Sequence, residues 1–222
     1  PTIAPYLLPD MVQDFAERCP NVELEIREIT TPEIIAAMER DKIDAAILAG
    51  GTCPDGINEE DIFDDHFYAY VSPTHPFYER NNVRVEELNL SEMLLLREGH
   101  CLRDQILDLC PSRAGRKHAS YYFESGSLET IMRIVDSTYF MTIIPEIALP
   151  YIPQEHKAQV KPLAKGAVSR KVSVAVRRTY VKDTLIKQFK EAIMAVCEKR
   201  ALTIMAKIPP AQDRMPVVFV AA

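Results

Sequence analysis

Residues 22–29 read VELEIREI, residues 31–39 read TPEIIAAME and residues 45–49 read AAILA, and this stretch decides the predicted fold class. The first run alternates apolar and charged residues, which predicts a β-strand. A Thr-Pro-Glu start predicts a helix in the second run, with Thr31 as its cap. The third run is entirely apolar and a Gly-Gly pair ends it, which is typical of a buried parallel strand. Together the three runs predict a βαβ unit.

The same two periodicities continue along the whole chain, so we expect an α/β fold with mostly parallel strands. Strand patterns occupy residues 93–96, 119–124, 141–144 and 170–177. Helical patterns occupy residues 6–15, 101–110, 127–135 and 182–207.

Changes in composition near residues 63–67 and 165–167 predict two crossovers between two Rossmann-like lobes. We expect residues 1–64 plus 168–222 to form lobe I and residues 65–167 to form lobe II. Two crossings leave a cleft, and α/β proteins bind small ligands beyond the carboxyl ends of their strands. No strand precedes the first helical pattern, so we expect the chain to have been cut just upstream of Pro1. The segment 209–222 could be a strand, a packing arm or disorder.

The composition excludes several classes of protein. A hydrophobic fraction of 47% and a net charge of −6 are ordinary for a globular chain and argue against disorder and against nucleic acid binding by these residues. No apolar run is long enough to cross a membrane, and no signal peptide is visible. The five cysteines are dispersed and do not suggest a disulfide framework, so we expect a cytoplasmic protein. Neither the cysteines nor the histidines have the spacing of metal ligands, so we expect no metal or cofactor.

The segment 96–105, LREGHCLRDQ, has the strongest chemical pattern. A strand ends, Gly99 turns the chain, and Cys101 falls at a helix start, where backbone N–H groups favour thiolate over thiol. His100 and Arg103 add donors or positive charge nearby. This arrangement suits a peroxide-reactive cysteine. The alternative is that Cys101 is a small apolar residue that fills space at the helix start.

A second cysteine, Cys110, follows nine residues after Cys101. If the segment is one helix, the two Cα atoms lie about 13 Å apart, at ~1.5 Å per residue, and on opposite faces. A disulfide needs Cα atoms within about 7 Å, so this pair cannot be bridged while the helix stands. Oxidation would pull Leu102, Ile106 or Leu109 from the core, which would make a conformational switch. Two unrelated cysteines in one segment are the alternative.

The motif at 99–105 with its second cysteine resembles the redox centre of OxyR-type hydrogen peroxide sensors, a group of LysR-type transcriptional regulators. Segments 1–9, 127–130 and 142–145 extend the resemblance over most of the chain. It implies a periplasmic-binding-protein-like effector domain, with Cys101 as the peroxide-reacting residue and Cys110 as the resolving one.

The resemblance also implies a set of pocket residues. For the two threonines the alternative role is N-capping, for His100 and Asp104 it is local hydrogen bonding, and for Phe123 it is core packing. The implied peroxide pocket comprises Thr2, Thr31, His100, Arg103, Asp104, Phe123 and Arg170.

We therefore expect the redox-sensing regulatory domain of a peroxide-responsive activator that is not an enzyme. The resemblance implies a homodimer or homotetramer, an upstream helix-turn-helix domain that binds DNA, glutaredoxin or thioredoxin as reductant, and RNA polymerase as a candidate partner. A module of the same fold that binds a small anionic metabolite is the alternative, and a thiol peroxidase that turns over ranks last. We expect Cys19, Cys53 and Cys197 to be structural or incidental.

Overall fold

The computed structural model describes residues 1–222 except 52, 111–122, 124, 165–167, 180–182 and 208–222. The helices are α1 (Ala4–Arg18), α2 (Thr31–Glu39), α3 (Cys101–Leu109), α4 (Leu128–Asp136) and α5 (Asp183–Lys207). The strands are β1 (Ala45–Ala49), β2 (Ile57–Val71), β3 (Val83–Arg84), β4 (Met141–Pro145), β5 (Val160–Ala164) and β6 (Ser169–Arg177). Short 3-10 helices are η1 (Val85–Glu87), η2 (Leu90–Glu92), η3 (Glu146–Tyr151) and η4 (Gln154–Gln159).

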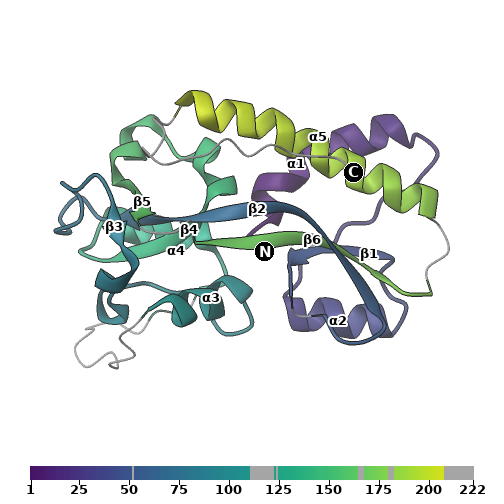
Figure 1. Ribbon diagram of the computed structural model, residues 1–222, viewed down its shortest axis with the longest axis horizontal. Helices are drawn as coiled ribbons and strands as arrows, with labels where there is room; N and C mark the ends of the chain where they lie inside the picture. The colour runs from purple at the N-terminus through teal and green to yellow at the C-terminus, as the bar shows by residue number, and fades with distance from the viewer. Residues whose placement is uncertain (52, 111–122, 124, 165–167, 180–182, 208–222) are drawn as a thin grey trace.

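Two long strands, β2 and β6, form the axis of the molecule. The sheet has the order β1-β6-β2-β5-β3, and β4 also pairs with β2. β2 and β6 are antiparallel from the pair Ile57–Arg177 to the pair His66–Ser169, with an irregularity after Asp61. Figure 1 shows β1 and α2 at one end of this ribbon and β3, β4, β5, α3 and α4 at the other. The ribbon therefore connects the two ends of the fold.

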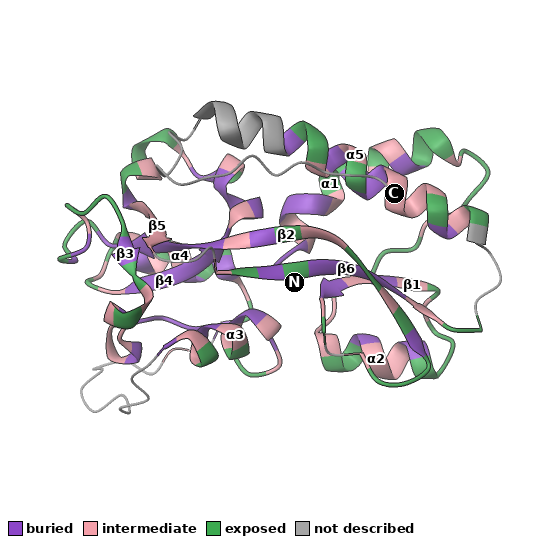
Figure 2. Cartoon of the chain, in the orientation of Figure 1, coloured by how far each residue is buried: buried purple, intermediate pink, exposed green. Residues whose placement is uncertain are grey.

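The apolar core forms two clusters along this axis. The smaller cluster joins α2 to β1 and β6 and includes Met38, Leu48 and Ala175. The larger cluster combines residues of α1 and α5 with the end that carries α3 and α4. Figure 2 shows buried residues in each of these helices. The boundaries of the two predicted lobes are not tested by this distribution and stay a prediction.

The α/β fold class is confirmed, but the expectation of mostly parallel strands is wrong. β2 pairs antiparallel with β4, β5 and β6, and β1 pairs antiparallel with β6. Among the named strands of the described residues, only β3 and β5 are parallel. An apolar run indicates that a strand is buried on both faces. Antiparallel strands covered by helices are buried in the same way as parallel ones, so the pattern cannot distinguish the two directions.

Two of the predicted strands are absent from the described residues. Residues 22–29 form none, and Val22 and Ile26 are 39% and 43% exposed. A strand requires a hydrogen-bonded neighbour, and alternation alone does not supply one. Residues 93–96 form only two isolated bridges, Met93 with Met141 and Leu96 with Ser125.

Other elements follow the sequence closely. The predicted helices at 101–110, 127–135 and 182–207 and the strands at 45–49, 141–144 and 170–177 are confirmed to within about two residues at each end. Ser127 caps α4 by accepting a hydrogen bond from the Thr130 amide at 3.3 Å. The cap of α2 is Thr30 rather than Thr31, because Glu33 closes a capping box with Thr30. The predictions for 119–124 and 209–222 concern residues that lie wholly or largely outside the described part of the chain.

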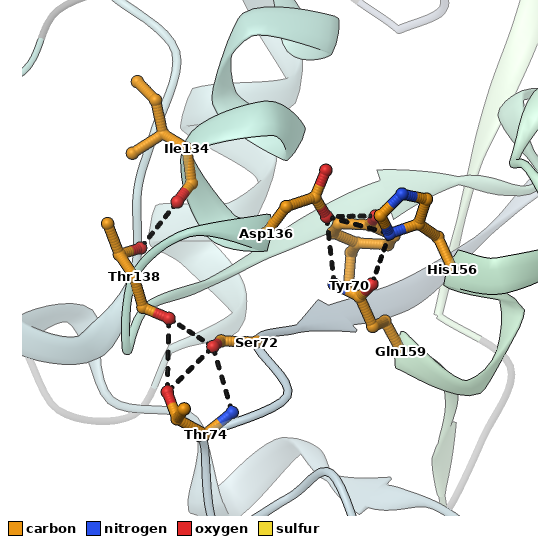
Figure 3. A network of polar contacts seen from close by, with 8 residues as sticks. All are labelled: Tyr70, Ser72, Thr74, Ile134, Asp136, Thr138, His156 and Gln159. Carbon is orange, nitrogen blue, oxygen red and sulfur yellow. Dashed lines mark hydrogen bonds and ion pairs between the residues drawn. The ribbon is translucent and has the colours of Figure 1, made fainter.

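Side-chain hydrogen bonds fix the carboxyl end of α4 to the sheet (Figure 3). The Tyr70 hydroxyl donates to Asp136 Oδ1 at 2.6 Å, and Gln159 Nε2 donates to the same oxygen at 3.1 Å. Below them, Ser72 Oγ donates to the carbonyl of Thr138, which follows the helix. α4 is thus held at its end by β2 and η4. None of the described helices is long and apolar enough to cross a membrane.

Adjacent residues of α4 test how much of its stability comes from burial. Ile131 is fully buried, whereas Thr130 is exposed. We expect Ile131→Ala to lower the free energy of unfolding by about 2–5 kcal/mol, the usual range for a large core residue. Thr130→Ala should change it by no more than about 0.5 kcal/mol. Urea unfolding followed by circular dichroism measures both values, and equal losses in the two variants would contradict the assignment of the core.

Candidate redox site

The turn before α3 places Cys101 at the first residue of that helix. Gly99 has φ +91°, a left-handed conformation that glycine adopts without strain. His100 then serves as the N-cap, with extended backbone angles. Leu102 and Ile106 lie one turn apart and are buried, so they fix the rotation of α3. As a result, the partly buried thiol of Cys101 lies at the amino end of the helix.

The amino ends of α2 and α3 meet at this thiol. Thr31 is the first residue of α2, and its Oγ1 lies 2.7 Å from Cys101 Sγ. Either atom can be the donor of this hydrogen bond. Helix amino ends carry partial positive charge from unpaired N–H groups. The site therefore offers a hydroxyl donor and two helix dipoles to a negative charge at the Cys101 sulfur.

A buried polar triad, formed by Thr2, Asp65 and Arg170, joins β2, β6 and the segment before α1. Asp65 and Arg170 face each other across the β2–β6 ladder, and Arg170 Nε donates to Asp65 Oδ2 at 2.9 Å. Arg170 Nη1 donates to Thr2 Oγ1 at 2.8 Å, and Nη2 donates to the Thr2 carbonyl at 3.3 Å. The second oxygen of Asp65 accepts the Ile147 amide at 3.0 Å. All members of the triad are less than 9% exposed.

His100, next to Cys101, is buried, and neither of its ring nitrogens has a hydrogen-bond partner among the described residues. A Cβ atom at Gly126 would lie 3.5 Å from His100 Nε2 and 3.3 Å from Arg97 Nε. The glycine therefore leaves room for these two side chains. Burial lowers the pKa of His100, which keeps the imidazole neutral near pH 7.

The second thiol, that of Cys110, lies at the other end of α3. Cys110 is the C-cap and is 4% exposed, and its Sγ lies 3.7 Å from the thioether sulfur of Met93. Burial in this apolar environment raises the pKa of the Cys110 thiol. Both Cys101 and Cys110 are free thiols. Nine helical steps of ~1.5 Å put their Cα atoms about 13 Å apart, beyond the reach of a disulfide.

The structure brings together some predicted pocket residues and separates others. Thr31 contacts Cys101, and Arg170 contacts Thr2. Arg103 instead donates to the Leu96 carbonyl at 3.0 Å and stabilises the turn.

The two remaining pocket candidates have less direct positions. Asp104 is exposed in the first turn of α3, and Phe123 is partly buried against the apolar core. Sequence reasoning missed Asp65 and Met93, because neither belongs to a motif. Among the described residues, no group of three or more acidic, cysteine or histidine side chains is arranged to hold a metal ion. Burial raises the pKa of Cys53 and of Cys197 to about 12.

The whole arrangement belongs to a recognised class of regulatory domain. Residues 1–198 match the family model of the LysR substrate binding domain. The chain is therefore a member of this family, whose fold is the α/β architecture described above.

Within this family, the chain is similar to several curated proteins and solved structures whose names refer to hydrogen peroxide or to OxyR. A "Probable hydrogen peroxide-inducible genes activator" from Mycobacterium leprae is 31% identical over 193 residues, which cover 87% of this chain and 62% of that protein. The "DNA-binding transcriptional dual regulator OxyR" of Escherichia coli K12 is 29% identical over 195 residues, which cover 88% and 63%. The crystal structure of OxyR from Porphyromonas gingivalis matches with a TM-score of 0.80 and 30% identity over 87% of this chain and 88% of that one. The chain spans less than two thirds of the length of these curated relatives.

The different environments of the two thiols lead to a prediction about labelling. In the native, reduced protein we expect iodoacetamide to modify Cys101 much faster than Cys110, because Cys110 is buried and its thiol pKa is raised. Peptide mapping by mass spectrometry after timed alkylation measures both rates. Unfolding in urea should remove the difference. Equal native rates would contradict the buried position of Cys110.

The burial of His100 predicts an acid-side loss of stability. Its folded pKa lies below its unfolded value, so the unfolded state binds the proton more readily. Stability should fall as the pH drops below about 6.5, the ordinary histidine pKa. In His100→Gln this part of the slope should disappear. Urea midpoints between about pH 5.5 and about pH 7.5 measure it, and an unchanged slope in the variant would show that other groups cause the loss.

Proposed function

We propose that this chain is the regulatory domain of a hydrogen-peroxide-responsive LysR-type transcription regulator. The observation that carries the proposal is the placement of two free thiols at opposite ends of α3, with Cys101 beside Thr31 and Cys110 buried. The names of relatives that match over most of the chain support the same function. The position of Cys101 at a helix amino end suits an activated nucleophile. Cys110 is buried and would react only after Cys101 has been oxidised.

The first chemical step is attack of the Cys101 thiolate on one oxygen of hydrogen peroxide. An S–O bond forms as the O–O bond breaks, so sulfur loses two electrons and peroxide gains them. Cys101 becomes a sulfenic acid, and the thiol proton leaves with the second oxygen as water. Thr31 is close enough to orient the sulfur or the incoming peroxide.

The second step is attack of Cys110 on the sulfenic acid, which forms a disulfide and releases water. Helix geometry forbids this bond while α3 is intact. Leu102 and Ile106 are 0% and 1% exposed, so unwinding α3 removes them from the core. Bond formation therefore opposes helix hydrogen bonds and apolar burial, and the domain changes conformation when it is oxidised.

The wider organisation follows from the same proposal. Residues 1–64 plus 168–222 and residues 65–167 would act as two lobes, with the redox cysteines in the second. Rearrangement of α3 would alter a homodimer or homotetramer and so reposition DNA-binding domains of the longer protein, with RNA polymerase as a further partner. Glutaredoxin or thioredoxin in a reducing cytoplasm would restore the thiols. A sensor of this kind reacts once with peroxide and stays oxidised until it is reduced, whereas a peroxidase would consume peroxide in repeated cycles.

A brief pulse of near-stoichiometric hydrogen peroxide tests the proposal directly. We expect non-reducing peptide mapping to find a Cys101–Cys110 disulfide that dithiothreitol reverses. Cys101→Ser should abolish it, and Cys110→Ser should accumulate a sulfenic acid that dimedone traps, because the resolving thiol is missing. Free thiols at both positions after the pulse would refute the redox function. Binding of small carboxylates by Cys101→Ser would then favour the metabolite-binding alternative.

Unwinding of α3 gives a second, structural prediction. The amide protons of residues 104–109, which have acceptors within α3, should exchange slowly in the reduced domain and faster by an order of magnitude or more after oxidation, because the helix has to open. Hydrogen exchange read by mass spectrometry measures this change, and α4 serves as the internal control. Unchanged protection of α3 in a domain that contains the disulfide would contradict the proposed conformational change.

A further inference from the structure

The buried triad of Thr2, Asp65 and Arg170 makes the Thr2 hydroxyl an acceptor toward Arg170 and leaves its hydrogen free to be donated elsewhere. A threonine hydroxyl has one hydrogen to donate and two lone pairs that accept. Arg170 Nη1 donates to Thr2 Oγ1 and so occupies one lone pair. Among the described residues, the Thr2 hydroxyl takes part in this one hydrogen bond, in which it is the acceptor. Within the described part of the chain, the hydrogen of this hydroxyl is therefore not donated to any group.

Asp65 determines this arrangement although it does not touch Thr2. Its Oδ2 accepts Arg170 Nε and lies 2.9 Å from Nη2, so the carboxylate fixes the plane of the guanidinium group. Its other oxygen is fixed by the Ile147 amide. Both acidic and basic side chains are 0–1% exposed, so water does not compete for these bonds. The carboxylate therefore fixes the guanidinium group in the orientation in which Nη1 donates to Thr2 Oγ1.

Residue 1 of the chain links the triad to Cys101. The nitrogen of Pro1 interacts electrostatically with Arg170 and with Cys101. Residue 1 is thus a common neighbour of both groups, and Thr2 follows it directly. The Cys101 sulfur itself is paired with a different threonine, Thr31. The hydroxyl of Thr2 is therefore available to donate a hydrogen bond to hydrogen peroxide, with which Cys101 reacts.

We propose that Asp65 is a positioning residue for the peroxide reaction, which acts through Arg170 to present the Thr2 hydroxyl as a hydrogen-bond donor to the departing peroxide oxygen. This inference rests on the proposed function. As the S–O bond forms, the second oxygen takes the electron pair of the O–O bond and becomes hydroxide, which the thiol proton converts to water. A donor directed at that oxygen stabilises the charge that develops on it.

The test separates peroxide chemistry from general reactivity of the thiol. Iodoacetamide reacts with the same sulfur, but its leaving group, iodide, is a weak hydrogen-bond acceptor. The ratio of the peroxide rate to the alkylation rate at Cys101 therefore reports stabilisation of the leaving oxygen. We expect Asp65→Asn to lower this ratio about 10- to 100-fold, the range for one hydrogen bond to a developing charge. A purely structural role for Asp65 would change both rates together and leave the ratio constant.

Matched variants keep the result decisive. Asp61→Asn makes the same substitution in the same strand pair at an exposed ion pair with Lys171, and it should leave the ratio unchanged. If the unpaired Arg170 prevents Asp65→Asn from folding, Asp65→Leu combined with Arg170→Met removes both charges and should lower the ratio as much. Thr2→Val should lower it as well, whereas Thr2→Ser should retain it. In the Thr2→Val background, Asp65→Asn should cause no further decrease.

The outcomes distinguish this inference from the proposed function. A normal ratio in Asp65→Asn, or in the charge-free double variant, would overturn the positioning role even if the wild type forms its disulfide. An additive effect of Asp65→Asn in the Thr2→Val background would also overturn it, because Asp65 would then act by another route. If wild-type Cys101 reacts with peroxide no faster than free cysteine, the proposed function itself fails.

Discussion

The antiparallel pairing of β2 with β6 is the interaction on which the rest of the structure depends. It runs from one end of the fold to the other and connects the two apolar clusters. The same register places Asp65 opposite Arg170, so the ladder builds the buried ion pair. Breaking such a pair by removing one partner is costly, because the other charge stays buried. A single strand pairing thus determines both the shape of the domain and the orientation of Thr2.

A second constraint, the rise of an α-helix, connects structure to function. α3 keeps Cys101 and Cys110 about 13 Å apart at ~1.5 Å per residue, and it presents Leu102 and Ile106 to the core. The reduced state is stabilised by that burial and by the helix hydrogen bonds. The S–S bond would stabilise a different conformation. In the proposed function, these two arrangements of one segment compete, and formation of the disulfide would favour the second one and change surfaces far from Cys101.

Much of this could be predicted from residue patterns, and the errors have clear physical causes. The start and end of α3 and the place of Cys101 follow from Gly99 and from apolar spacing, which are local signals. The direction of the strands does not, because a buried strand has the same apolar pattern in either direction. Residues 22–29 alternate like a strand but pair with nothing in the described part of the chain. The predicted cap of α2, Thr31, lies one residue after the observed cap, Thr30, because both threonines are suitable caps.

Residue patterns were sufficient to predict the α/β fold class, the positions of most helices and the place of both cysteines on one helix, since periodicity and motifs depend on neighbours along the chain. The groups that surround Cys101 became known from the folded structure. Thr31 is 70 residues away from it, and Asp65 is 105 residues away from Arg170. No local pattern encodes such contacts, because they depend on strand register and on how helices pack over the sheet. For that reason the helix that carries the two cysteines could be predicted from the sequence, whereas the contacts of Asp65 required the fold.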